Sequence, residues 1–284
     1  MLRRLFVLMS CCLIIEMSRA EEVKPLKALL VCGGCCHDYK NQKDILKKGI
    51  EARAHVVVDI VFSPDGSVKP PLEIYGKPDY AKDYDVVIHD ECSAGIADPA
   101  VIAGVLKPHK DGIPGVNLHC AMHCYRIGNP NQVADPGSER AAWFDYLGLQ
   151  SSGHGPQEPI AITYTDKDHA ISKGMEDWVT IKEELYNNIK IGTGHALASG
   201  KQTVHNKDKE GNVTDKDVTT VVIWTNEYTD KKTRVFSTTI GHNNQTVSDP
   251  RYLDLVTRGL LWACNKPFET YMKPKTDTAP APVK

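Results

Sequence analysis

Short apolar runs alternate with amphipathic stretches along the first half of the chain. The apolar runs are rich in β-branched and aliphatic residues, which is typical of buried strands, and the stretches between them show helical periodicity. The predicted elements are strands at residues 27–32, 56–62, 85–89 and 113–118, and helices at residues 44–54 and 99–109. Strands that alternate with helices indicate an α/β fold with a mostly parallel sheet covered on both faces.

The second half of the chain has a more mixed pattern. The predicted elements are strands at residues 159–164, 196–198, 219–226 and 234–239, a helical turn at 143–147 and a terminal helix at 252–265. Residues 205–217 are charged and predict a loop, and residues 269–284 predict a disordered tail because Pro, Lys, Thr and Ala dominate them. Residues 21–268 are expected to form one domain.

The N-terminus has the pattern of a signal peptide. Arg3 and Arg4 precede an apolar run over residues 5–15, and small residues at 18–20 suit a cleavage site. The run is too short to span a membrane as a helix, although an uncleaved anchor remains an alternative. We therefore predict a signal peptide at residues 1–20 and a protein exported to the periplasm or secreted, with no integral membrane segment after cleavage.

Composition and charge narrow the function classes. The chain has 284 residues, a net charge of −2 and 41% hydrophobic residues, which is ordinary for a globular protein. A near-neutral charge gives no electrostatic footprint for nucleic acid. Of nine cysteines, Cys11 and Cys12 lie in the predicted signal peptide, so the remaining number is odd and at least one thiol is unpaired by any intrachain disulfide. The spacing assigns no disulfide and no oligomeric state.

The segment 118–124, Leu-His-Cys-Ala-Met-His-Cys, is the strongest candidate for chemistry. It follows the predicted strand 113–118, and ligands of open α/β sheets bind at the carboxyl ends of strands. If a helix begins here, His119 and His123 lie one turn apart on the same face. They are candidates for proton transfer or, alternatively, for two ligands of a divalent metal such as zinc.

Other polar residues are expected near the same sheet edge. His37 and Asp38 follow the first strand and a Gly pair, and His154 and His242 lie in glycine-containing loops, which often carry function. The segment 89–91, His-Asp-Glu, either lines the same crevice or forms an acidic cluster at a helix start. His109 is expected to be solvated.

The order and spacing of these motifs resemble the ThuA-like, or trehalose-utilisation, family. The motifs that carry the resemblance are Gly33 and Gly34, His37 and Asp38, Leu118 and His119, residues 143–148, His154, Asp168 and His169, residues 183–186, residues 240–242, and residues 262–263. The resemblance implies a flavodoxin-like three-layer sandwich related to class I glutamine amidotransferases, and a link to sugar metabolism. It also implies roles for Glu184 as an acid or base and for Tyr186 in holding a sugar hydroxyl.

The chain departs from the amidotransferase pattern at the expected nucleophile. A nucleophile elbow needs small residues two positions before and after the nucleophile, because the turn is strained. Leu118 and Met122 occupy those positions around Cys120. We therefore predict that the protein is not a glutamine amidotransferase.

These observations together predict an exported enzyme that acts on a carbohydrate or keto-sugar derivative by histidine acid–base chemistry. The predicted catalytic residues are His119, His37 and Glu184, and the predicted substrate-binding residues are Asp38, His154, Tyr186, Trp224 and His242. Metal assistance through His119 and His123 stays open. A non-catalytic sugar-binding or scaffold protein of the same fold, and a metal-binding protein that uses the His and Cys clusters, are the alternatives.

Overall fold

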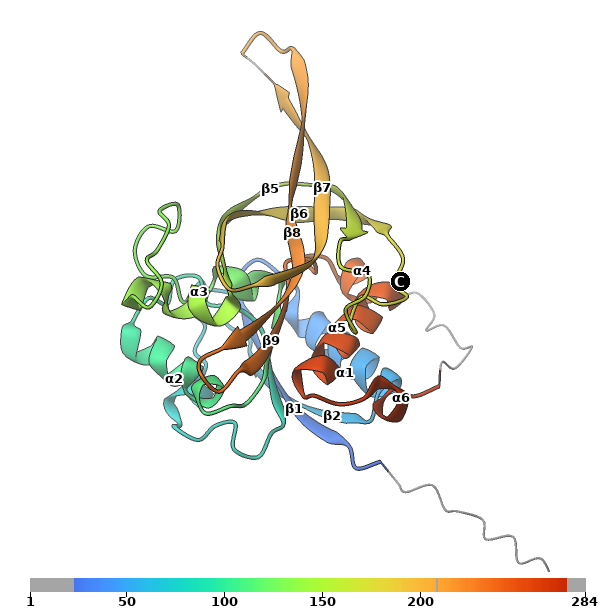
Figure 1. The fold of residues 1–284 in the computed structure, drawn as a ribbon. Coiled ribbons are helices and arrows are strands. Elements are labelled where there is room, and N and C mark those ends of the chain that lie inside the picture. Colours follow the sequence, from blue (N-terminus) through green and yellow to red (C-terminus); the bar gives the residue numbers. More distant parts are fainter. Residues whose placement is uncertain (1–22, 208, 275–284) are drawn as a thin grey trace, which may run out of the picture.

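A nine-stranded sheet is the central element of the fold (Figure 1). The structure is a computed structural model, and it describes residues 23–207 and 209–274. The strand order of the sheet is β2 (Val56–Ser63), β1 (Leu26–Gly34), β3 (Val86–Cys92), β4 (Gly115–Leu118), β9 (Thr233–Thr238), β8 (Val213–Tyr228), β7 (His195–Lys207), β5 (Leu149–Tyr164) and β6 (Trp178–Ile191).

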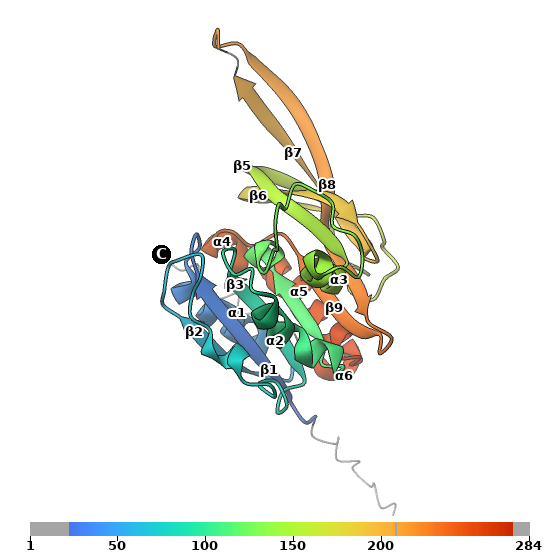
Figure 2. The ribbon, with the colours of Figure 1, turned by 90° about the vertical axis from the view of Figure 1, so that its left-hand side faces the viewer.

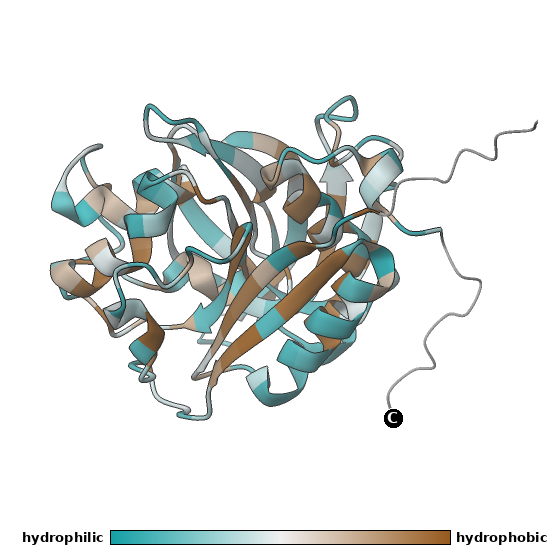
Figure 3. Cartoon of the chain, turned by 90° about the horizontal axis from the view of Figure 1, so that it is seen from below, coloured by the Kyte–Doolittle hydropathy of each residue, from teal (hydrophilic) through white to brown (hydrophobic). Residues whose placement is uncertain are grey.

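The first five strands in that order, β2, β1, β3, β4 and β9, form a parallel half of the sheet. All neighbouring pairs among them are parallel, and apolar residues of these strands are buried on both faces. Helices α1 (Tyr39–Arg53) and α5 (Pro250–Ala263) cover one face, and α2 (Pro99–Lys110) and α3 (Ala142–Leu147) cover the other (Figure 2). Figure 3 shows the resulting pattern, with brown central strands between helices whose outer sides are largely teal. This half matches the predicted alternation of strands and helices.

The other half of the sheet is antiparallel. The prediction of a mostly parallel sheet therefore holds only for the parallel half. Strands β9, β8, β7, β5 and β6 pair antiparallel in that order. Strand β6 was not predicted, because its polar residues and its bulged pairing with β5 obscure a period-two pattern. Short elements complete the fold, namely η1 (Glu73–Gly76), η2 (His119–His123), η3 (Glu139–Ala141), α4 (Asn244–Val247) and α6 (Phe268–Tyr271).

Strands β7 and β8 extend beyond the rest of the sheet as a long hairpin (Figure 1). The predicted loop 205–217 is therefore wrong in extent, since strand pairing continues to Lys207 and resumes at Val213. Cross-strand pairs explain why a charged sequence forms strands here: Lys201 Nζ lies 2.6 Å from Asp217 Oδ2, and His205 Nδ1 lies 2.7 Å from Asp215 Oδ1.

The predicted tail is ordered at its beginning. Helix α6 covers residues 268–271, Met272 forms an isolated bridge with Ala54, and the Lys273 amide donates to the Arg53 carbonyl at 2.7 Å. Residues 275–284 and the predicted signal peptide at 1–20 lie outside the described residues. Within the described ranges, no helix is both long and apolar enough to cross a membrane.

A buried hydrogen-bond network links β3 to α2. His109 Nδ1 donates to the Ile113 carbonyl at 2.7 Å, which leaves its Nε2 to accept from His89 Nε2 at 3.0 Å. His89 Nδ1 lies 3.0 Å from Glu91 Oε1, which also accepts from the Tyr75 hydroxyl at 2.7 Å. His109 is thus buried and paired where solvation was expected. Burial, and then the neighbouring His89, lower the pKa of His109 to about 3.

The low pKa of His109 predicts that the folded protein loses stability in acid. A histidine in the unfolded chain titrates near pH 6.5, so between that pH and about 3 the unfolded state binds a proton that folded His109 does not. Stability should fall with falling pH across this window, by up to ~1.4 kcal/mol per pH unit from this residue. His109→Asn keeps an amide donor for the Ile113 carbonyl and should flatten the slope in urea unfolding between pH 7 and 4. The exposed His205→Asn is the control. The hydrogen bond to Asp215 raises the pKa of His205, so below about pH 5 its ring is protonated in the folded and unfolded chains alike, and its removal should leave the slope there nearly unchanged. An equal slope in His109→Asn and the wild type would refute the assignment.

Candidate active site

Three histidines from distant parts of the chain meet at the carboxyl edge of the parallel half. His37 follows β1, His119 follows β4 at the start of η2, and His242 follows β9. Their ring centroids lie 4.6 Å apart for His37 and His119, 4.8 Å for His37 and His242, and 5.5 Å for His119 and His242. The parallel register of the strands explains this convergence, because it places the residues that follow each strand at one edge.

Tight backbone turns allow this approach. His119 has a φ of +41°, a left-handed conformation that side chains with a Cβ rarely adopt, and it turns the chain sharply at the end of β4. Gly241 has a φ of +129°, and a Cβ added there would lie 2.7 Å from the Tyr252 hydroxyl oxygen. Non-glycine residues with strained backbone conformations cluster at active sites, so the conformation of His119 supports a functional role for this turn.

The orientation of His119 is fixed by one backbone carbonyl. Its Nδ1 lies 2.6 Å from the Thr239 oxygen, and because a carbonyl can only accept, Nδ1 carries a proton. Its Nε2 is buried, has no hydrogen-bond partner among the described residues, and lies 3.5 Å from Glu184 Oε2. Nε2 is therefore the ring atom of His119 that is left to take a proton or to bind a cation.

Glu184, on β6, is the negative centre of the site. Its carboxylate oxygens lie 3.3 Å from His242 Nδ1 and 3.6 Å from His154 Nε2, in addition to the contact with His119. Burial opposes ionisation of Glu184, but the close contacts with His119 and His242 and their charge attraction hold the pKa of its carboxyl below the usual range. The close contact with the Glu184 carboxylate in turn raises the pKa of His242. Gln157, which sequence patterns did not single out, donates to Glu184 Oε1 at 3.4 Å and lies 2.8 Å from His242 Nε2.

His37 is the neutral member of the histidine cluster. Burial, followed by the neighbouring His119 and His242, lowers the pKa of His37 to about 2. The buried nitrogens without a hydrogen-bond partner in the described ranges include His37 Nδ1, His119 Nε2 and His242 Nδ1. One ring nitrogen of each of these histidines lies within 4.8 Å of one from each of the others, a spacing that suits the imidazole ligands of a divalent metal.

An open pocket of about 610 Å³ gives access to the cluster. Its walls include His37, Asp38, His242 and Asn244. The Asp38 carboxylate accepts from the side-chain amides of Asn41 and Asn244, both at 2.6 Å, and these hydrogen bonds lower its pKa. Asp38 is exposed, so it is available to a ligand at the mouth of the pocket.

Glu183 holds the loop after β9, a role that sequence patterns did not reveal. Its carboxylate accepts from the amides of Gly241, His242 and Asn243 at 3.3, 2.9 and 3.2 Å. The side chain is fully buried. In the sequence, the adjacent acidic residues 183 and 184 were the signal that could have indicated this role. In the structure, Glu183 positions the loop and Glu184 contacts the histidines.

His123 does not join His119 as a pair of metal ligands. Segment η2 is a 3₁₀ helix, in which residues four apart point about 120° away from each other, whereas in an α-helix they share a face. His123 Nε2 lies 3.0 Å from Ser151 Oγ, and its ring stacks on Tyr186 with centroids 4.0 Å apart. The Tyr186 ring also lies 5.0 Å from that of His119, so Tyr186 packs between the two histidines.

One further predicted role is changed by the structure. Trp224 is a core residue, only 1% exposed, whose Nε1 donates to the Leu147 carbonyl at 2.7 Å, so it does not present a face to a sugar. Cys120, which occupies the nucleophile position of the amidotransferase pattern, forms a disulfide with Cys92.

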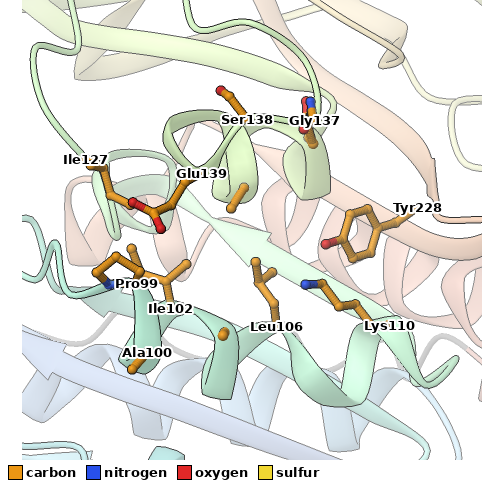
Figure 4. Close-up of a pocket in the computed structure, with 13 residues that line it drawn as sticks. Pro99, Ala100, Ile102, Leu106, Lys110, Ile127, Gly137, Ser138, Glu139 and Tyr228 are labelled. Carbon is orange, nitrogen blue, oxygen red and sulfur yellow. Dashed lines mark hydrogen bonds between the residues drawn. The ribbon is translucent and has the colours of Figure 1, made fainter.

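A second pocket, of about 600 Å³, lies between α2 and α3 (Figure 4). Ile102 and Leu106 give it an apolar floor, and Lys110, Glu139 and Tyr228 add polar groups at its sides. None of the described residues that line it is a histidine or a cysteine. The histidine cluster is therefore the better candidate for catalysis.

Comparisons with known proteins agree with this architecture. A ThuA-like protein of Parabacteroides merdae superposes with a TM-score of 0.60 at 20% identity, covering 89% of this chain and 93% of that protein. One from Bacteroides uniformis superposes with a TM-score of 0.56 at 16% identity, covering 86% and 94%. At these identities the likeness shows the fold alone.

A search of curated proteins found no match. The model of the ThuA family, described as trehalose utilisation, matches residues 28–263, which is most of the chain. The protein therefore belongs to the ThuA family.

Proposed function

We propose that this protein is an exported enzyme that acts on a carbohydrate or keto-sugar derivative by histidine acid–base chemistry. The observation that carries the proposal is the convergence of His37, His119 and His242 on Glu184 beside an open pocket. The trehalose-utilisation description of the family supports the substrate class. The predicted signal peptide supports export.

The strand order supports a finer assignment of the architecture. In order of appearance along the chain, the strands of the parallel half lie as 2-1-3-4-5, which is the flavodoxin-like order. Ligands of such sheets bind beyond the carboxyl ends near the first and third strands, and His37 follows β1 there. We propose that this half is the flavodoxin-like core related to class I glutamine amidotransferases, and that the antiparallel strands are an addition that supplies Glu184.

His119 is the proposed base. Its Nδ1 is committed to the Thr239 carbonyl, so a substrate proton is taken by Nε2. Glu184 Oε2 lies 3.5 Å from this same nitrogen and attracts the imidazolium that forms. The Thr239 carbonyl holds the opposite nitrogen, the position that the carboxylate takes in a catalytic triad. His242 Nδ1 and His154 Nε2 contact the same carboxylate and help to keep it ionised beside the base. Asp38 is placed to bind a hydroxyl at the pocket mouth.

A divalent metal is the second candidate, favoured by the three buried nitrogens that lack partners. His37, His119 and His242 would hold the ion, with Glu184 beside them as a further ligand. A bound ion would polarise a carbonyl oxygen or acidify a hydroxyl. The low pKa of His37 suits this role, because metals bind neutral imidazole.

Loss of the proposed base should abolish turnover. His119→Ala should reduce the rate on the responsive substrate by about 10²- to 10⁴-fold, the usual contribution of a general base. The assay would follow products from trehalose and from its keto derivatives by mass spectrometry. His205→Ala, on the exposed hairpin, is the matched control and should keep the wild-type rate. Full activity in a folded His119→Ala protein would reject the mechanism.

Metal content separates the two candidates. If the histidines hold a metal, protein dialysed against zinc and then against buffer should retain about one ion per chain, measured by elemental mass spectrometry. His37→Ala should lose that ion, and His123→Ala should keep it, because His123 lies outside the cluster. Zinc retained equally by His37→Ala would contradict this site, and no retained zinc in the wild type would leave acid–base chemistry without metal assistance.

A further inference from the structure

Four cysteines form a continuous row of sulfur atoms next to the histidine cluster. Cys35 and Cys36 form a disulfide in the loop after β1. Cys92, at the end of β3, forms a disulfide with Cys120 in η2. Cys35 Sγ lies 3.6 Å from Cys92 Sγ, so the two disulfides are in contact.

The sheet explains why these residues meet. Gly34 pairs with Cys92 across β1 and β3, and a Cβ added to Gly34 would lie 2.4 Å from the Cys92 carbonyl oxygen. Only glycine permits so close an approach, and the next residue, Cys35, is carried directly to the end of β3. The contact between the disulfides is therefore built into the strand register.

The outer disulfide is more exposed than the inner one. Cys36 is exposed and Cys35 is half-buried, whereas Cys92 is 2% and Cys120 is 6% exposed. A reductant in solution reaches the outer disulfide, and the inner disulfide is shielded from it. The inner pair, however, is touched by a sulfur of the outer pair, which is the contact that thiol–disulfide exchange requires.

The remaining cysteines of the described ranges do not belong to the row. Cys32, Cys124 and Cys264 are unpaired, and burial raises the pKa of each thiol, which makes them poor nucleophiles. Cys124 is held in place by the Ser93 amide, which donates to its sulfur at 2.9 Å, and by its own contact with the Glu91 carbonyl at 3.1 Å.

We propose that the row is a thiol–disulfide relay, in which the Cys35–Cys36 pair passes electrons from an external dithiol to the buried Cys92–Cys120 pair. The dithiol first reduces Cys35–Cys36 and becomes a disulfide itself. Cys35 thiolate then attacks Cys92 Sγ, the Cys92–Cys120 bond breaks, and Cys120 leaves as a thiolate that takes up a proton. Cys36 thiolate next attacks Cys35 Sγ, which restores the outer disulfide and releases Cys92 as a thiol after protonation. In net terms, one dithiol is oxidised and the inner disulfide is reduced.

The relay extends beyond the proposed enzymatic function and its test does not depend on that function. Cys120 directly follows His119, and its disulfide ties η2 to the end of β3. Reduction of this bond would release the segment that positions His119. The partner implied by the exposed outer pair is a reductant that carries two thiols.

Stepwise trapping tests the relay. The full chain would be treated with dithiothreitol, quenched with acid, alkylated and mapped by peptide mass spectrometry at successive times. In Cys36→Ser, the lone Cys35 thiol should attack the inner pair and stop there, giving a Cys35–Cys92 cross-link and an alkylated Cys120. Cys36 Sγ also lies within 4.8 Å of Cys92 Sγ, so both outer sulfurs must be removed to block the relay. In the double variant Cys35→Ser/Cys36→Ser, alkylation of Cys92 and Cys120 should be at least about tenfold slower than in the wild type, because no outer sulfur is left to attack the inner pair.

Cys264→Ser is the matched control and should reduce with wild-type kinetics, because Cys264 lies outside the row. Circular dichroism would establish that each variant is folded. Wild-type kinetics in the folded double variant Cys35→Ser/Cys36→Ser would overturn the relay. Absence of the Cys35–Cys92 cross-link in folded Cys36→Ser would do the same.

Discussion

The carboxylates of the adjacent residues Glu183 and Glu184 connect the antiparallel half of the sheet to the histidines at the edge of the parallel half. Both lie on β6, at the far edge of the antiparallel half. Glu183 binds three consecutive backbone amides of the loop after β9, and Glu184 contacts the side chains of His119 and His242. Buried carboxylates need such partners, because an unpaired charge would be costly in the interior. The antiparallel half therefore supplies two carboxylates to the site.

Much of the parallel half could be predicted from sequence, because a strand buried on both faces leaves a continuous apolar run. The antiparallel half was harder. Strand β6 carries charged residues next to buried ones, and the far end of the β7–β8 hairpin has almost no apolar residues to mark it. Pairing between strands, visible only in three dimensions, stabilises both. His109 shows the same limit for single residues, since nothing in its neighbours along the chain indicates that His89 will meet it in the core.

Within the site, the rule that ligands bind at strand ends selected His37 and His119, which the structure brings to one edge, because the rule depends only on the direction of parallel strands. His242 was selected from its glycine-containing loop instead. Geometry inside a turn is not predictable in this way. The exact helical type of η2 decides that His123 points toward Ser151 and Tyr186 rather than toward His119. Trp224 illustrates another limit, because an aromatic residue near a strand end has the same sequence signature in a core as in a sugar site.

The turn after β4 links the histidine chemistry to the sulfur row. Residue 119 adopts a left-handed backbone, which is costly for a histidine, and such strain persists only where surrounding contacts hold it. The Thr239 carbonyl provides one such contact through the His119 ring, and the Cys92–Cys120 bond provides another at the next residue. Both anchors attach the turn to neighbouring strand ends, one following β9 and one ending β3. The position of the His119 ring therefore depends on the Cys92–Cys120 bond, which Cys35 contacts. A change in the redox state of the cysteine row would for this reason change the geometry of the histidine site.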